Sequence, residues 1–318
     1  MQKTKIVMLD DWENYFSSQL DCSSFKDKID ITIHQKTLKG KELHQAIIDA
    51  EVIILLRERT AVDREFIAKA PKLKQIICTG NQVRNLDSEA VQEAGIKLSF
   101  AKGGDSKSTT AELTWTLMLS AYKQLDKLRI SPAQRQWRQQ DIAHEVFIPT
   151  MLKGKQLGII GLGSIGQKVA AVAKAFGMEV ACWSPNMNPK RAAEHGAKAL
   201  SLEELLSTSD IVSIHLVLSE STHHILNADN LNSFKKGAVL VNTSRAEIID
   251  PEALLNTLQN GSLGYYASDV FEQEPLPSEH PLYSLDNVLM TAHFGFVAEE
   301  VYRLFADNIR KELIDYLG

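Results

Sequence analysis

The feature that most constrains the fold of this chain is the glycine-rich segment GLGSIG, residues 161 to 166. It follows the apolar run KQLGII (155 to 160) and precedes the Ala-rich run QKVAAVAKAF (167 to 176). An apolar run of this length favours a strand, and the Ala-rich run favours a helix. The segment therefore has the strand-to-helix context that the GxGxxG fingerprint of dinucleotide-binding proteins requires.

Each glycine of this segment has a separate physical role in such a site. Gly161 permits a tight turn, Gly163 lets the backbone approach a pyrophosphate, and Gly166 allows the helix to lie close to the strand. The phosphates would be held at the N-terminus of the helix. We predict a dinucleotide site here, with a glycine-rich β–α turn that binds no ligand as the alternative.

Ser184 occupies the position where such a site usually carries an acid. It follows the predicted strand 178 to 183, and an Asp or Glu at the end of that strand would bind the ribose hydroxyls. A carboxylate there would also repel a 2′-phosphate, so its absence removes a barrier to NADP. Lys190 or Arg191 could supply a counter-charge if the loop folds back, or both could be solvated residues of a helix end. The predicted cofactor is NAD or NADP, with relaxed or NADP-leaning choice.

The rest of the chain alternates short apolar runs with helix-length segments, which is typical of β-α-β units and parallel sheets. A first series of predicted strands covers 5–9, 29–34, 52–56, 74–78 and 96–100, and a second covers 155–161, 178–183, 210–216, 238–243, 264–270 and 288–292. Between the two series, residues 108 to 128 contain a long apolar stretch without Pro or Gly. We predict one buried helix there, joining two α/β domains, and a one-sided helix over 297 to 317.

Composition excludes several classes of partner. The chain has 318 residues and a formal net charge of −5, which gives no electrostatic attraction for nucleic acid or an anionic membrane. Its three cysteines are far apart and without a CxxC pair, so neither a disulfide framework nor a metal site is predicted. The start, MQKTKIVMLDD, is too polar for a signal peptide. We expect a cytoplasmic protein with a small-molecule substrate.

Three segments after the late strands carry the residues suited to chemistry: VNTSRAE (241 to 247), SDVFEQEPL (268 to 276) and TAHFGF (291 to 296). In open α/β sheets, ligands bind outside the carboxyl ends of the strands, so Arg245, Glu274 and His293 could meet in one crevice. A guanidinium can bind the carboxylate of a 2-oxo acid and polarise its ketone. An imidazolium held by a carboxylate can deliver a proton as hydride arrives.

Together with these segments, TGNQVRNLD (79 to 87), TTAELTWTLML (109 to 119) and LVNTSRAEIIDPEAL (240 to 254) make the chain resemble the D-isomer-specific 2-hydroxyacid dehydrogenases. The resemblance covers nearly the whole chain. It implies an α/β fold of two Rossmann-like domains, one flavodoxin-like and one dinucleotide-binding, each with a parallel sheet. The NAD(P)-binding domain, 106–287, would be inserted into a discontinuous substrate domain formed by 1–105 and 288–318.

The resemblance also implies an activity and a site. The reaction would be hydride transfer between nicotinamide and a 2-oxo acid or (2R)-2-hydroxy acid, with Arg245 binding the acid, His293 as acid/base, and Glu274 supporting His293. Asp269 would hold the nicotinamide carboxamide, and Ser164 and Ile165 the pyrophosphate. The other implied cofactor contacts are Thr110, Gly161, Gly163, Gly166, Ser184, Thr243, Ser244 and His293, and the implied substrate contacts are Thr79, Gly80, Asn81 and Arg245.

The same resemblance implies a homodimer, with the contact in about residues 125 to 153. That segment, which includes Trp137, Val146, Phe147, Ile148 and Met151, fits neither domain's β-α rhythm, and a packed connecting loop is the alternative. Because no regulatory domain follows residue 318, we expect an enzyme outside end-product-controlled biosynthesis.

Two positions depart from the family pattern. Ala292 replaces the proline of the usual TPH, and Val217 replaces the proline expected after HL. Both positions shape loops. Two other functions stay open: a formate- or phosphite-type dehydrogenase on the same fold, and a non-catalytic dinucleotide-sensing protein. Glyoxylate, hydroxypyruvate, 3-phosphoglycerate and longer 2-oxo acids all remain candidate substrates, with Arg84 as a candidate phosphate ligand.

Overall fold

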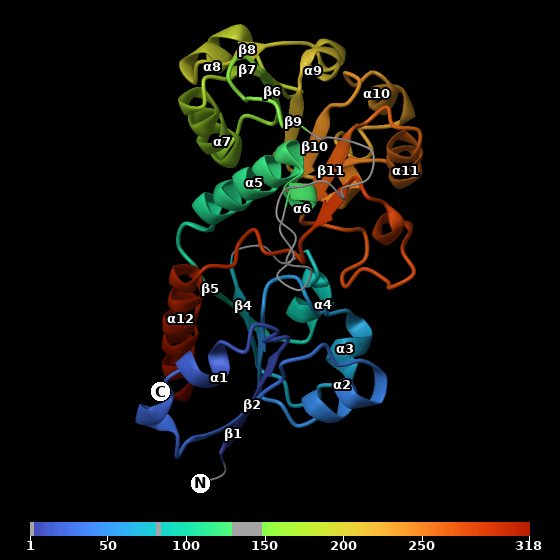
Figure 1. Ribbon diagram of the computed structural model, residues 1–318. Helices are drawn as coiled ribbons and strands as arrows, with labels where there is room; N and C mark the ends of the chain where they lie inside the picture. Colours follow the sequence, from blue (N-terminus) through green and yellow to red (C-terminus); the bar gives the residue numbers. More distant parts are fainter. Residues whose placement is uncertain (1–2, 81–83, 129–147) are drawn as a thin grey trace. The chain divides into compact units, whose positions relative to one another are not determined.

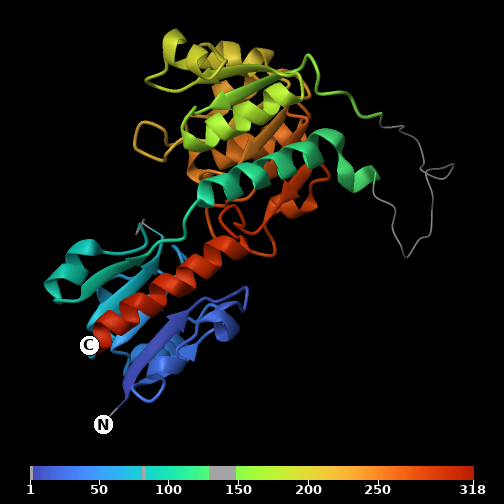
Figure 2. The same ribbon diagram turned by 90° about the vertical axis from the view of Figure 1, so that its left-hand side faces the viewer.

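The computed structural model describes residues 3–80, 84–128 and 148–318, which form two compact units (Figures 1 and 2). Unit 1 consists of Met1–Ser106 and Val297–Gly318, and unit 2 consists of Lys107–Phe296. The chain therefore leaves unit 1 once and returns to it. The return lies at Val297 and not at the expected residue 288, because Val288–Met290 forms a strand of the sheet of unit 2.

Unit 1 is built on a five-stranded sheet whose paired strands are all parallel, in the order β2-β1-β3-β4-β5. This is the flavodoxin-like order, as predicted. Its elements are β1 (Thr4–Leu9), α1 (Phe16–Gln19), η1 (Ser23–Phe25), β2 (Ile29–Ile33), α2 (Gly40–Ile47), β3 (Val52–Leu55), α3 (Arg64–Ala68), β4 (Gln75–Thr79), α4 (Ser88–Glu93), β5 (Lys97–Ala101) and α12 (Glu299–Leu317).

Helices cover both faces of this sheet, which explains why its inner strands β3 and β4 are buried along their whole length. On one face, Ile53 and Ile76 pack against Ile47 of α2, Phe66 of α3 and Val91 of α4. On the other face lie α1 and α12 (Figure 1). Helix α12 packs against β4 and β5, and Tyr302 contacts Phe16 of α1 at a ring distance of 5.5 Å.

Unit 2 is built on a seven-stranded parallel sheet in the order β12-β11-β10-β9-β6-β7-β8. From β8 to β11 this is the Rossmann order, and it confirms the predicted fold class. The elements are α5 (Ser106–Lys123), α6 (Leu125–Leu128), β6 (Gln156–Ile160), α7 (Ser164–Ala175), β7 (Glu179–Trp183), α8 (Pro189–Glu194), β8 (Lys198–Ala199), α9 (Leu202–Thr208), β9 (Ile211–Ile214), α10 (Ala228–Asn232), β10 (Val239–Asn242), η2 (Ala246–Ile248), α11 (Pro251–Gln259), β11 (Tyr265–Ser268), η3 (Pro281–Ser284) and β12 (Val288–Met290).

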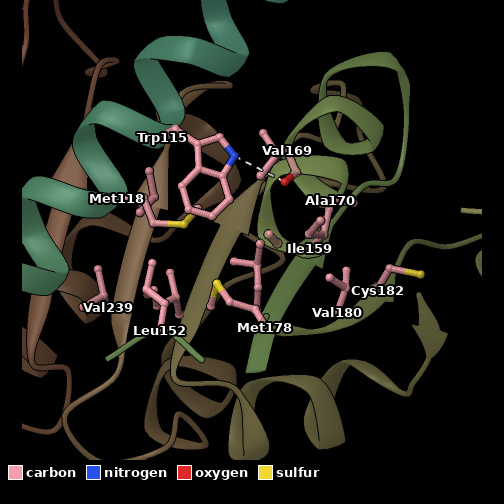
Figure 3. Packing of buried hydrophobic residues seen from close by; sticks show 14 of the residues in the cluster. Trp115, Met118, Leu152, Ile159, Val169, Ala170, Met178, Val180, Cys182 and Val239 are labelled. Carbon is pink, nitrogen blue, oxygen red and sulfur yellow. Dashed lines mark hydrogen bonds between the residues drawn. The ribbon is translucent and has the colours of Figure 1, made fainter. Parts of the chain in front are cut away.

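Helices also cover both faces of the second sheet. Figure 3 shows one face, where Trp115 of α5 lies among buried side chains and its Nε1 donates to the carbonyl of Val169 in α7 at 3.2 Å. Trp115 is only 6% exposed, so it belongs to the core. Helices α9, α10 and α11 supply the opposite face, where Leu205, Leu231 and Leu254 are buried. The core thus holds the carboxyl ends of the strands in fixed positions.

The predicted helix over 108 to 128 is wrong at its C-terminal end. Helix α5 ends at Lys123, and Gln124 adopts a left-handed φ of +46° before α6 begins. A left-handed residue cannot continue an α-helix, so the segment bends there.

Within residues 3–80, 84–128 and 148–318, no helix combines the length and the apolar character that a membrane span requires. The same described residues contain no group of three or more His, Cys, Asp or Glu side chains placed to hold a metal ion.

Candidate active site

The glycine-rich turn after β6 is closely packed. Gly161 has a φ of +101°, and a Cβ there would lie 2.7 Å from the carbonyl carbon and oxygen of His215. A Cβ at Gly166 would lie 2.3 Å from the carbonyl oxygen of Gly161. Both positions therefore require glycine, one for the turn and one for close packing of α7.

The N-terminus of α7 is open beside this turn. Gly163 is the N-cap residue, and within the described chain no side chain caps its helix. A Cβ at Gly163 would meet no described atom within 4 Å, and both Gly163 and Ser164 are exposed. Uncapped N–H groups at the positive end of a helix dipole bind anions, so these residues fit the pyrophosphate of a dinucleotide.

A lysine lies at the same helix end. Nζ of Lys107, in the first turn of α5, donates to Oγ of Ser164 at 3.4 Å. The first turn of α7 carries no acidic side chain within the described structure. An ammonium beside the positive end of a helix dipole is unfavourable on its own and becomes favourable when an anion is bound between them. Lys107 thus places a positive charge beside this end of α7.

Ser184, directly after β7, begins a tight turn. Its carbonyl accepts a bond from the N–H of Met187 at 3.0 Å, and the side chain of Asn188 caps α8. Nη1 of Arg191 donates to the carbonyl of Asn186 at 2.9 Å. The guanidinium of Arg191 is therefore folded back onto the turn that follows Ser184.

The structure brings the predicted chemical residues together at the carboxyl ends of β10, β11 and β12. Nδ1 of His293 lies 2.6 Å from Oε2 of Glu274, and each side chain is 30% exposed. The N–H of Phe271 donates to Oε1 of Glu274 at 2.9 Å. Burial by itself raises the pKa of Glu274, but the hydrogen bond and charge of His293, the Phe271 N–H and the charge of Arg245 hold that pKa below its ordinary value.

A short turn after β10 presents Arg245. The side chain of Asn242 accepts from the N–H of Ser244 at 3.0 Å and donates to the carbonyl of Arg245 at 2.9 Å. Nη1 of Arg245 donates to the carbonyl of Ser244 at 2.7 Å. The charge of Arg245 is the smallest of the named effects that lower the pKa of Glu274.

The hydroxyl groups of Thr243 and Ser244 make bonds inside unit 2. Oγ1 of Thr243 lies 2.8 Å from Oγ1 of Thr114, and Oγ of Ser244 donates to the carbonyl of Leu216. These bonds connect the turn after β10 to α5 and to the end of β9. The predicted cofactor contacts of these two residues stay predictions.

Asp269, directly after β11, is 1% exposed and accepts hydrogen bonds from the loop that carries His293. Burial raises the pKa of Asp269, although hydrogen bonds from Thr291, Phe294 and Gly295 and the charge of His293 oppose the shift. On the far side of the loop, Oγ1 of Thr110 donates to the carbonyl of Gly295 at 2.8 Å.

In unit 1, the predicted substrate loop follows β4. Oγ1 of Thr79 accepts from the N–H of Arg57 at 2.8 Å, and Thr79 itself is fully buried. A Cβ at Gly80 would lie 2.0 Å from Nη1 of Arg57, so the guanidinium of Arg57 lies against this glycine. Asn81, the third predicted substrate contact, lies outside the described residues.

The geometry of unit 2 agrees with the sequence comparisons. Residues 115–295 match the family model for the NAD binding domain of D-isomer specific 2-hydroxyacid dehydrogenases. The hydroxypyruvate reductase of Thermotoga maritima is 32% identical over 295 residues, covering 92% of each chain. This chain belongs to the D-isomer specific 2-hydroxyacid dehydrogenase family. The predicted family is thereby confirmed.

Other members of the family differ from this chain in length. The D-3-phosphoglycerate dehydrogenase of Methanocaldococcus jannaschii is 39% identical over 282 residues, which are 87% of this chain and 52% of that protein. The chain thus spans about half the length of such relatives. Among solved structures, a phosphoglycerate oxidoreductase from Vibrio cholerae has a TM-score of 0.87 and 30% identity, covering 98% of both chains.

Sequence reasoning missed Lys107 and Thr291 beside the predicted site residues of unit 2, and Arg57 beside the predicted loop of unit 1. Arg57 is the second residue after β3 and has a left-handed φ of +54°. The amino-acid sequence alone does not indicate this conformation. Lys107 lies two residues before the family-like segment 109–119, but neither that position nor its charge indicates a contact with Ser164.

Proposed function

We propose that this member of the family catalyses reversible hydride transfer between a nicotinamide dinucleotide and a 2-oxo acid or (2R)-2-hydroxy acid. The observation that carries the proposal is the 2.6 Å contact between Nδ1 of His293 and Oε2 of Glu274. A bound nicotinamide would supply or accept the hydride. The side chains of the protein would bind the acid and transfer the proton.

His293 is the proposed acid/base. With Nδ1 engaged by Glu274, Nε2 is the nitrogen left to give a proton to the substrate oxygen during reduction and to take it back during oxidation. The carboxylate of Glu274 fixes the tautomer of the neutral ring and stabilises the imidazolium form. Arg245 is proposed to bind the substrate carboxylate through two donors and to polarise the carbonyl.

The proposed dinucleotide site combines the open turn of α7 with contacts that family membership supports. Gly161, Gly163, Ser164, Ile165 and Gly166 would hold the pyrophosphate, and Lys107 would add a cation there. Family membership supports Thr110, Thr243, Ser244 and Asp269 as further contacts of the cofactor.

For the choice between the two dinucleotides, we favour NADP over NAD. Ser184 offers no carboxylate to repel a 2′-phosphate, and Arg191 is tied by a 2.9 Å bond to Asn186 in the same turn. The planar guanidinium is well suited to a phosphate. This combination supports binding of the 2′-phosphate beside Ser184.

The proposed substrate is a small 2-oxo acid. Relatives named as hydroxypyruvate reductase, glyoxylate reductase and D-3-phosphoglycerate dehydrogenase all match this chain. The loop that begins with Thr79 and Gly80 is proposed to bind the acid as in the family. Arg57 lies against Gly80 and places a cation at this loop, which makes it a better candidate ligand for a second anionic group than Arg84.

We further propose that the protein is a homodimer located in the cytoplasm. Leu125, Leu128, Ile148 and Met151 are large apolar residues that are 46% to 74% exposed at the two ends of 129–147, a segment outside the described residues. Apolar side chains exposed in a group favour burial in an interface. Light scattering at twice the mass of the chain would support the dimer, and a single-chain mass would contradict it.

The test of the activity is a spectrophotometric screen of NADH and NADPH against glyoxylate, hydroxypyruvate, 3-phosphohydroxypyruvate, pyruvate and longer 2-oxo acids. The expected result is loss of reduced-nicotinamide absorbance with at least one acid, abolished in His293→Ala. Binding of the dinucleotide without turnover on any acid would favour the non-catalytic sensing function instead.

A further inference from the structure

The loop that carries His293 is held on both sides of that residue by one buried carboxylate. Oδ1 of Asp269 accepts from Oγ1 of Thr291 at 2.5 Å and from the N–H of Phe294 at 2.7 Å. Oδ2 of Asp269 accepts from the N–H of Gly295 at 2.7 Å. His293 lies between the first and the last two of these donors in the sequence, so its backbone is bracketed by Asp269.

The backbone conformation of His293 makes such support necessary. Its φ is +56°, in the left-handed region that residues with a side chain rarely adopt. A conformation of this kind persists only where the surroundings over-determine it. The bonds to Asp269, together with the bond from Thr110 to Gly295, are constraints of that kind.

Among the three hydrogen bonds from this loop to Asp269 described above, only one has a side-chain donor. Phe294 and Gly295 donate from the backbone and cannot be removed singly by ordinary substitution, whereas Thr291 donates from its hydroxyl. The N–H of Thr291 continues the strand pairing by donating to the carbonyl of Ser268 at 2.9 Å. Thr291 therefore connects the end of β12 to Asp269, two residues before His293.

We infer that Thr291 is a positioning residue for His293, acting through its hydrogen bond to the carboxylate of Asp269. The inference rests on the proposed function and deepens it. An ionised carboxylate offers about four acceptor sites. Three donors of the loop already use Asp269, so this carboxylate serves the His293 loop whether or not it also meets the nicotinamide carboxamide.

The test uses three variants. Thr291→Val replaces the hydroxyl with a methyl group of similar size, and Thr291→Ala removes the hydroxyl without placing a methyl group against the carboxylate. Thr291→Ser keeps the hydroxyl. Since a small misplacement of a catalytic group can cost up to about 100-fold in rate, we expect kcat of the first two variants to fall by about tenfold or more. KM for the acid and Kd for NADPH should stay close to the wild-type values, and Thr291→Ser should regain most of kcat.

Thr257→Val is the matched control. Thr257 is 2% exposed in α11, and its hydroxyl donates to the carbonyl of Ala253 within the helix. The substitution Thr257→Val removes a buried hydroxyl from unit 2 and should leave kcat unchanged. An equal fall of kcat in this control, or an unchanged kcat in Thr291→Val and Thr291→Ala, would overturn the inference.

A readout that does not depend on turnover separates this inference from the proposed function. The imidazole resonances of His293, assigned by their loss in His293→Gln, should shift or broaden in Thr291→Val and Thr291→Ala and keep their wild-type positions in Thr291→Ser. If wild type reduces no 2-oxo acid, the proposed function fails, while the resonances still test the positioning. A rise of Kd for NADPH in proportion to the loss of kcat would place the hydroxyl's effect on the cofactor and contradict the inference.

Discussion

Nδ1 of His293 lies 2.6 Å from Oε2 of Glu274, and the second oxygen of that carboxylate is held by the N–H of Phe271. Each oxygen of Glu274 thus has its own partner, so the carboxylate cannot rotate away from His293 without losing a hydrogen bond. The pair is built from two loops, one after β11 and one after β12. Its geometry depends on the sheet that aligns these strands.

Removal of the imidazole should abolish most of the activity. We expect His293→Ala to lower the rate of 2-oxo acid reduction by roughly 10²- to 10⁴-fold, the range for a lost general acid or base. Kd for NADPH, measured by fluorescence, should stay close to that of wild type. Wild-type turnover in this variant would remove His293 from the chemistry.

The lowered pKa of Glu274 predicts a contribution to stability that depends on pH. Because its pKa in the folded protein lies below the ordinary value of 4.5, the unfolded chain binds more protons in the window below that value. The contribution is complete above pH 4.5 and is lost as the pH falls through the folded pKa.

Glu274→Gln should therefore flatten the acid side of the stability profile. The measurement is the free energy of unfolding in urea at pH values on both sides of 4.5. Glu272→Gln, which removes an exposed carboxylate from the same loop, is the control. A profile for Glu274→Gln that keeps the full wild-type slope would mean that the contact with His293 does not persist in solution.

Most of the fold could be predicted from the sequence, because the inner strands of both sheets are buried and form short, mainly apolar runs separated by helix-length segments. All the strands predicted from such runs are present. Strand β8 was missed because its two residues, Lys198 and Ala199, form no apolar run. The end of α5 was misplaced because Gln124 is not a helix-breaking residue, so its type does not indicate the left-handed φ of +46° that it adopts.

Within the site, the sequence predicted the residues that directly follow strands and missed those whose role depends on loop folding. Arg245 and His293 follow β10 and β12, where the fold collects functional groups. The contacts of Arg57 with Gly80 and of Lys107 with Ser164 join residues far apart in the chain, and no local pattern encodes them.

The position of Lys107 predicts a charge-dependent loss of cofactor affinity. We expect Lys107→Gln to raise Kd for ADP-ribose, measured by calorimetry, by about three- to tenfold at low salt, and Lys107→Arg to have a smaller effect. Because the contribution is exposed and electrostatic, the difference should shrink at high salt. Adenosine, which lacks the pyrophosphate, should bind all three proteins equally. A loss of affinity that is the same for adenosine would indicate a general disturbance of unit 2.

Ser184 and Arg191 together predict how the choice of cofactor can be reversed. Ser184→Asp adds an acceptor for the ribose hydroxyls and a negative charge close to any 2′-phosphate. The preference for NADPH should fall by about 1 to 3 kcal/mol, the value of a charged hydrogen bond gained or a charge left opposed in a partly exposed site.

Arg191→Gln tests the other half of the same argument, since it removes the cation and keeps a polar side chain. The ratio of kcat/KM for NADPH over NADH should fall in Ser184→Asp because NADH use holds while NADPH use drops, and it should fall in Arg191→Gln through loss of NADPH use alone. Lys190→Gln, one residue earlier on the exposed surface of α8, tests the other candidate counter-charge: a fall of the ratio in that variant and not in Arg191→Gln would assign the 2′-phosphate to Lys190. If the added carboxylate does not move the ratio, Ser184 does not face the ribose. If Arg191→Gln leaves the ratio unchanged while Ser184→Asp lowers it, the 2′-phosphate is bound without Arg191, although the guanidinium of Arg191 folds back onto Asn186.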